Sequence, residues 1–102
     1  MSQTPESKVK SEISKYLTSL EMAGLPIYYE ARPAGGLTFK KGMPDIWMIY
    51  NGIHIEIEIK KPGGKMSIMQ KKQRRRLQKS NCLVYCVESK EEVEEIIKKI
   101  DS

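Results

Sequence analysis

The chain has 102 residues and a formal net charge of +5 at pH 7. That length suits a single domain, residues 1–102, which can bury roughly two thirds of its unfolded surface without disulfides or structural metal. Two cysteines and one histidine are too few for a zinc site of four protein ligands, and the longest apolar run, residues 46–50, cannot span a bilayer. The N-terminal residues also lack the apolar core of a signal peptide, so we expect a cytoplasmic, non-secreted protein with reduced thiols.

The basic charge is unevenly distributed along the chain. Residues 1–82 have a net charge of +8, and residues 83–102 have a net charge of −3. A positive surface of this kind suits a polyanion that is bound through its phosphates. The alternative is a solvated surface that keeps the protein soluble.

The first predicted element is a helix that begins near Thr4. Thr4 can cap the helix, Pro5 fits its first turn, and Glu6 favours its positive end. Gly24 and Pro26 are expected to end it. The buried face should be formed by apolar residues at helical spacing, namely Val9, Ile13, Tyr16, Leu17 and Leu20.

A short strand at residues 27–30 is predicted next, followed by a loop at residues 32–42. The glycines of this loop permit close approach of the backbone to a ligand, and cations flank them. We expect the loop to lie over a phosphate backbone. A flexible connector is the alternative.

Residues 45–60 predict a β-hairpin. Asn51-Gly52, between strands at residues 45–50 and 53–60, is the dipeptide typical of a two-residue hairpin turn. Isoleucine alternates with polar residues along the second strand, which is the period of a strand with one apolar face. The four isoleucines should therefore face the core, and the opposite face should carry His54, Glu56, Glu58 and Lys60.

The hairpin brings Asp45, at the start of one strand, beside the end of the other strand. Glu58 and Lys60 stand there, about 7 Å apart along the strand. Carboxylates can hold a divalent metal and a lysine can steer water, which are the requirements of phosphodiester cleavage. The alternative is a polar strand face that only meets water. His54 is interpreted as a surface or packing histidine and not as a base.

Two helices and one strand are predicted in the remaining chain. Ser67 and Gln70 form a capping-box pattern, which opens a helix that runs to about Lys79 with Met69, Gln73 and Leu77 on its inner face. Residues 82–87 predict a strand buried on both faces and reached by a crossover, and residues 90–100 predict a last helix. The predicted fold is α/β (α+β), a mixed four-stranded sheet flanked by helices in the order αβββαβα.

Cations of the loops and of the second helix are predicted to contact DNA phosphates. The set comprises Arg32, Lys40, Lys41, Lys61, Lys65, Lys71, Lys72, Arg74, Arg75 and Arg76.

These motifs together resemble a known nuclease family. Residues 42–45 (Gly-Met-Pro-Asp), residues 58–60 (Glu-Ile-Lys) and then Gln70 resemble the virus-type replication-repair nuclease (VRR-Nuc) domain of the PD-(D/E)XK superfamily. Spacing within the first helix matches the family at Glu6, Val9 and Leu17. The resemblance extends over nearly the whole chain and implies a core like that of restriction endonucleases.

The resemblance also implies a Mg²⁺- or Mn²⁺-dependent endonuclease. In this reading Lys60 orients or activates water, Gln70 supports the site, and Glu12 is a weaker competitor for the role of Glu6. The implied metal ligands are Asp45, Glu58, the Ile59 carbonyl and, directly or through water, Glu6.

Small stand-alone members of the family, typically from bacteriophages, resemble Holliday-junction resolvases and act as homodimers. The resemblance therefore implies a homodimeric DNA-repair enzyme that cuts four-way junctions, in the host cytoplasm if the chain is phage-encoded. A flap, single-strand or restriction-type nuclease with the same residues remains an alternative. So does a basic nucleic-acid-binding module without catalysis.

Overall fold

The computed structural model describes residues 5–33, 41–60 and 62–102. Three helices and four strands follow one another in the order α1 (Pro5–Met22), β1 (Ile27–Ala31), β2 (Ile46–Tyr50), β3 (Ile53–Ile59), α2 (Ile68–Lys79), β4 (Leu83–Val87) and α3 (Lys90–Asp101). This is the predicted order αβββαβα. No helix in the described ranges is long and apolar enough to cross a membrane.

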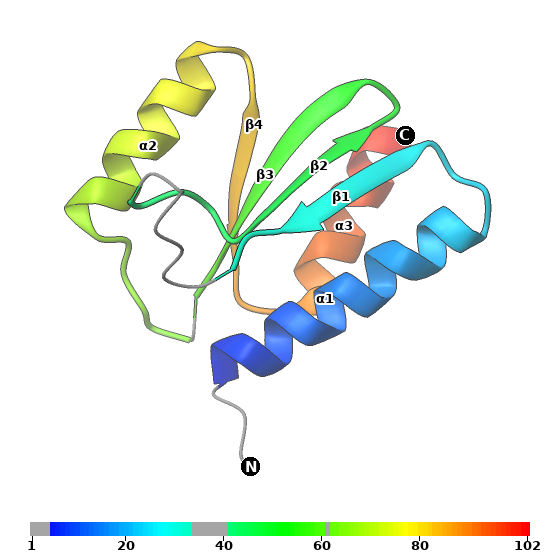
Figure 1. The fold of residues 1–102 in the computed structure, drawn as a ribbon, viewed down its shortest axis with the longest axis horizontal. Helices are drawn as coiled ribbons and strands as arrows, with labels where there is room; N and C mark the ends of the chain where they lie inside the picture. The colour runs from blue at the N-terminus through cyan, green and yellow to red at the C-terminus, as the bar shows by residue number, and fades with distance from the viewer. Residues whose placement is uncertain (1–4, 34–40, 61) are drawn as a thin grey trace.

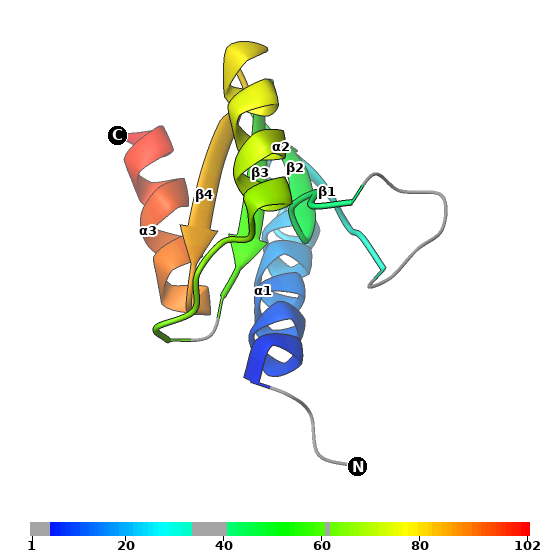
Figure 2. The same cartoon turned by 90° about the vertical axis from the view of Figure 1, so that its left-hand side faces the viewer.

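The strands form one sheet in the order β1-β2-β3-β4. The first three strands are antiparallel neighbours, and β4 pairs parallel to β3 after the crossover through α2. Figure 1 shows α2 on one side of the sheet, with α1 and α3 on the other. Figure 2, turned by 90°, shows α2 in front of the sheet and α1 behind it. The protein is thus a mixed sheet between two helical layers, as the sequence predicts.

The apolar core lies between the sheet and the layer formed by α1 and α3. Ile55, Ile57 and Ile59 of β3 are buried there, and they pack with buried residues of both helices, namely Ile13, Leu17, Val93, Ile96 and Ile97. The alternating pattern of β3 therefore predicts the core face correctly for three of its isoleucines. Ile53, the fourth, is exposed, and it lies at the turn end of the hairpin, directly after Gly52.

The hairpin turn sets the register of the site. Asn51 and Gly52 have φ angles of 49° and 82°, the positive values that a type I′ turn requires. The turn pairs Tyr50 with Ile53, and from there the register pairs Ile46 with Ile57. Asp45, one residue before Ile46, consequently lies beside the end of β3.

The expectation that residues 82–87 are buried on both faces is wrong. Leu83 is 38% exposed, and Cys86 is exposed as well. The physical reason is position, because β4 lies at the edge of the sheet, where the helices on the two faces cover it only in part. The proposed cap Thr4, residues 34–40 of the loop and Lys61 lie outside the described residues.

Candidate active site

The site predicted from the motifs lies where β2 begins and β3 ends, next to the first turn of α2. Oδ2 of Asp45 accepts a hydrogen bond of 2.8 Å from the backbone N–H of Ile59. Nζ of Lys60 lies 3.7 Å from Oε1 of Glu58. The register of the hairpin therefore brings Asp45, Glu58 and Lys60 together, although Asp45 is distant from the other two in sequence.

Gln70 links the helix to the two charged side chains of the strand. Its Nε2 donates to Oε1 of Glu58 at 2.8 Å, and its Oε1 accepts from Nζ of Lys60 at 2.8 Å. The same Oε1 accepts from the backbone N–H of Ser67 at 2.7 Å, which completes the capping box. Gln70 thus completes the helix cap and contacts both Glu58 and Lys60.

Glu58 is buried but incompletely satisfied. The residue is only 3% exposed, and no protein atom of the described residues forms a hydrogen bond with its buried Oε2. Burial is the largest cause that raises the pKa of Glu58, the nearby Asp45 carboxylate also raises it, and Lys60 lowers it, so that the pKa is about 8. The neighbouring positive charge is thus too weak to offset desolvation and the second acid.

This donor set fits a divalent cation of the magnesium type. Hard cations prefer oxygen ligands, and the carboxylates of Asp45 and Glu58 supply them. The unpartnered Oε2 of Glu58 is the observation that supports the fit, because a buried carboxylate oxygen without a partner is costly unless a cation or proton satisfies it. The charge of Glu6, in the first turn of α1, also raises the pKa of Glu58, which places Glu6 within electrostatic reach of the pair.

Gly42 allows α2 to lie close to the site. It has a φ of 80°, and a Cβ at this position would lie 2.7 Å from the backbone carbonyl carbon of Met69, one residue before Gln70. Nε2 of the buried Gln73 donates to the Lys41 carbonyl at 3.1 Å, so a hydrogen bond also links α2 to the residue before Gly42. Gly42 is therefore needed for helix packing next to Asp45, independently of any phosphate.

Comparison with known proteins identifies the fold. No family model matches the sequence, and no curated protein matches it. Among solved structures, one described as "VRR_NUC domain" aligns with a TM-score of 0.73 at 21% identity, covering 94% of this chain and 97% of its own. Another, "VRR_NUC domain protein", aligns with a TM-score of 0.73 at 18% identity, covering 97% of this chain and 89% of its own. The chain has the VRR-Nuc fold.

On this VRR-Nuc fold, the predicted DNA-contacting cations fall into three groups. Arg32 points inward, and its side chain is 15% exposed and forms an ion pair with Glu56. Lys40 and Lys61 are outside the described residues. Lys41 is exposed, and its backbone carbonyl accepts a hydrogen bond from Gln73. The other cations are exposed or half-buried on α2 and the turn before it, namely Lys65, Lys71, Lys72, Arg74, Arg75 and Arg76.

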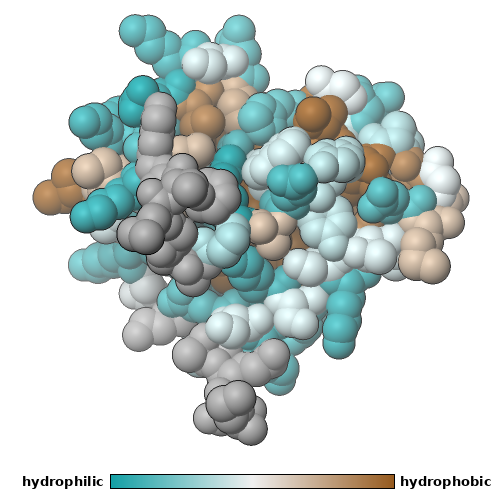
Figure 3. Space-filling view, viewed as in Figure 1, coloured by the Kyte–Doolittle hydropathy of each residue, from teal (hydrophilic) through white to brown (hydrophobic). Residues whose placement is uncertain are grey.

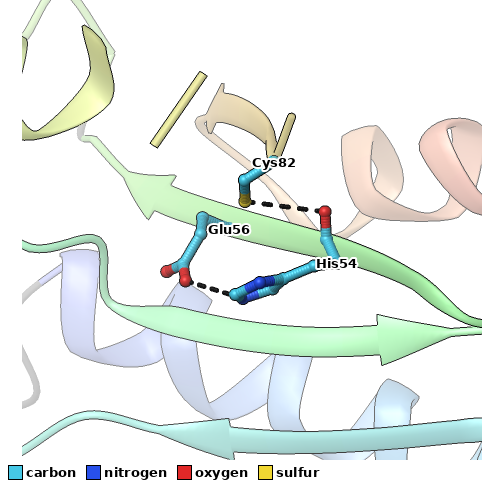
Figure 4. A group of neighbouring side chains, drawn as sticks. All are labelled: His54, Glu56 and Cys82. Atoms are coloured by element: carbon cyan, nitrogen blue, oxygen red, sulfur yellow. Dashed lines mark hydrogen bonds and ion pairs between the residues drawn. The ribbon is translucent and has the colours of Figure 1, made fainter. Parts of the chain in front are cut away.

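A second polar cluster of the VRR-Nuc fold was not predicted from the sequence. Glu56, on the same strand face as Glu58, is 1% exposed and accepts from Arg32, and Nε2 of His54 lies 2.9 Å from its Oε2 (Figure 4). Thiol Sγ of Cys82 lies near them, so that ligand atoms of His54, Glu56 and Cys82 are all within 4.8 Å of one another. The polar alternation of β3 signals these positions, but it does not show which cation reaches Glu56.

Proposed function

We propose that the chain is a Mg²⁺- or Mn²⁺-dependent DNA endonuclease that hydrolyses phosphodiester bonds. The observation that carries the proposal is the buried Oε2 of Glu58, which has no hydrogen-bond partner among the described residues, in a carboxylate that interacts with Asp45. The VRR-Nuc fold supports a nuclease, and the site offers the oxygen ligands that such a cation prefers.

Asp45 and Glu58 would hold the cation, with the Ile59 carbonyl and Glu6 as further ligands. A bound divalent cation supplies charge stabilisation at the phosphate and lowers the pKa of water. The chain contributes the positioning. Asp45 is fixed by the Ile59 N–H, and the Lys60 ammonium is held by Gln70 at 2.8 Å, so that it can orient a water or neutralise charge on the phosphate.

The basic surface next to the site is suited to DNA. α2 begins at the site with Ser67 and Gln70, and its exposed side continues with Lys71, Lys72 and Arg75. Figure 3 shows hydrophilic residues, with some hydrophobic ones between them, over the part of the molecule where Figure 1 places α2. Phosphates bound along this helix would direct the backbone of the DNA towards Glu58 and Lys60.

The DNA structure proposed as substrate is the four-way junction, cut by a homodimer. This part of the proposal rests on the resemblance to small stand-alone VRR-Nuc proteins. Two-fold symmetry of a dimer would present two sites to two strands of a junction. Light scattering gives the oligomeric state, and a panel of junction, flap, single-stranded and linear DNAs gives the preference. A preference for flaps or linear duplex would replace the junction by those substrates.

Variants of the site separate binding from cutting. Asp45→Asn or Lys60→Ala should retain junction binding and lose metal-dependent cleavage by about 10²-fold or more. The matched control is Glu30→Gln, which changes an exposed carboxylate on the neighbouring strand β1 that binds only Tyr28 in the described contacts. Unchanged cleavage in Asp45→Asn or Lys60→Ala would refute the proposal. Intact DNA binding without cutting by the wild type in clean Mg²⁺ and Mn²⁺ would instead favour a binding module.

A further inference from the structure

A buried ion pair lies next to the catalytic candidates, because its Glu56 stands two residues before Glu58 on β3. Nη1 and Nη2 of Arg32 donate to Oε1 and Oε2 of Glu56 at 2.6 and 3.1 Å, in the two-point geometry that guanidinium and carboxylate groups favour. Glu56 is 1% exposed, and Nε2 of His54 lies 2.9 Å from its Oε2 at the solvent edge (Figure 4). Both oxygens of this carboxylate therefore have a partner, whereas Glu58 has one for Oε1 but none for Oε2 among the described residues.

Arg32 also holds the segment that contains Asp45. Its Nη1 donates to the Pro44 carbonyl at 2.8 Å, and its backbone N–H donates to the Asp45 carbonyl at 2.7 Å. Nζ of Lys10 in turn donates to the Arg32 carbonyl at 2.5 Å. Two consecutive carbonyls, of Pro44 and Asp45, are thus bound by one residue that is itself fixed to β3 through Glu56.

Asp45 is held at both ends by these contacts. Its main chain is bound by Arg32, and its side chain accepts the Ile59 N–H. Because Glu56 and Ile59 belong to the same strand, β3 fixes both the carbonyl and the carboxylate of Asp45. Outer partners of this kind matter for metal sites, where their loss typically costs 10–100-fold in metal affinity.

A metal ion bound by His54, Glu56 and Cys82 is the competing reading of this cluster. The ligand atoms are close enough, at 4.8 Å or less from one another. However, Arg32 already pairs with both oxygens of Glu56, and the Cys82 thiol lies within hydrogen-bond distance of the His54 and Leu83 carbonyls. The geometry favours an internal ion pair over a cation site.

We propose that Arg32 and Glu56 form a clamp that positions Asp45 for metal binding. Arg32 and Glu56 are positioning residues, because they act through the Pro44–Asp45 peptide and do not reach the cation themselves. The role in metal binding rests on the function proposed above, whereas the placement of Asp45 can be tested without metal.

The Ile59 amide reports the position of the Asp45 carboxylate directly. In the metal-free protein, Arg32→Lys keeps the charge but loses the two-point geometry, so the exchange rate of the Ile59 amide proton should rise about five- to tenfold. Its NMR shift should move towards that of Asp45→Ala, while amides at the hairpin end, such as Ile53, stay unchanged. The double variant Arg32→Met with Glu56→Met replaces the pair by apolar groups that can remain folded, and it should perturb Ile59 in the same way.

Mn²⁺ binding, measured calorimetrically without DNA, gives the second readout. Both clamp variants should bind Mn²⁺ about 10- to 100-fold more weakly, and the control Glu30→Gln should bind like the wild type. A folded double variant with a wild-type Ile59 amide or a wild-type Mn²⁺ affinity would overturn the clamp. If Ile59 is perturbed but the wild type binds no Mn²⁺, the placement of Asp45 is supported and the proposed function fails.

Discussion

Two buried glutamates on the same strand face have opposite environments. Glu56 and Glu58 are 1% and 3% exposed and lie two residues apart on β3. Glu56 is paired with Arg32 through both oxygens and also contacts His54. Glu58 accepts a hydrogen bond from Gln70 and lies 3.7 Å from Lys60, its Oε2 has no partner in the described ranges, and its pKa is raised to about 8.

The two carboxylates differ in whether both of their oxygens are paired. A buried carboxylate that is fully paired contributes to the positions of its neighbours, and removing its charge leaves the partner cation unpaired. A buried carboxylate that lacks partners destabilises the protein until a cation or a proton binds. On this contrast rest our proposals that Glu56 positions its neighbours and that Glu58 binds a ligand.

The largest expected effect on stability is that of Glu56→Gln. The substitution keeps the shape of the side chain but leaves the Arg32 guanidinium buried without a counter-charge. We expect the free energy of unfolding to fall by about 3 kcal/mol in chemical denaturation. A loss below about 1 kcal/mol would mean that Arg32 does not depend on Glu56.

Glu58→Gln should change the free energy of unfolding in the opposite direction. Since the folded-state pKa of about 8 exceeds the ordinary value of 4.5, the folded protein binds the extra proton. Stability of the metal-free wild type should therefore fall as pH rises from about 5 to 8, and the cost should be complete above 8. Glu58→Gln should remove this slope and raise stability at pH 9 by about 2 kcal/mol. Parallel pH profiles of the two proteins would contradict the environment described for Glu58.

Gly42→Ala tests whether the contact between α2 and the Asp45 segment is needed. Gly24→Ala is the matched control, because Gly24 has a φ of 86° but nothing within 4 Å of an added Cβ. Both variants should lose stability through backbone strain, and Gly42→Ala should lose about 1–2 kcal/mol more because its Cβ meets the Met69 backbone. Thermal unfolding of the two variants measures the difference. Equal losses would show that the segment and the helix can separate without cost.

The smallest effect is expected for His54→Gln. His54 has a side chain that is 47% exposed, so its contact with Glu56 is screened by water. The variant should lose less than about 1 kcal/mol and keep the Ile59 amide exchange of the wild type. A loss as large as that of Glu56→Gln would transfer the main support of Glu56 from Arg32 to His54.

Local patterns in the sequence predict much of this fold and the convergence of Asp45, Glu58, Lys60 and Gln70. The alternation of β3, the Asn51-Gly52 turn and the Ser67 capping box each specify local geometry, and the register then follows from the turn length. The Arg32–Glu56 pair could not be predicted in this way. Arg32 precedes a long loop, and its partner depends on the path of the chain, so the residue was expected to contact DNA.

The edge position of β4 could not be predicted from the sequence for a similar reason. An apolar run indicates a strand, but burial of its second face depends on how far the helical layers extend over the edge strand β4. The buried state of Glu56 and Glu58 is likewise a tertiary property, since the polar face of an alternating strand is ordinarily solvated.

Calorimetric titration of the metal-free protein with Mn²⁺, comparing wild type with Glu58→Gln, tests the central claim most directly. The wild type should bind Mn²⁺, and Glu58→Gln should bind at least about tenfold more weakly while being as stable as the wild type or more so. Equal affinity in the two folded proteins, or no binding to the wild type, would contradict the assignment of Glu58 as a metal ligand.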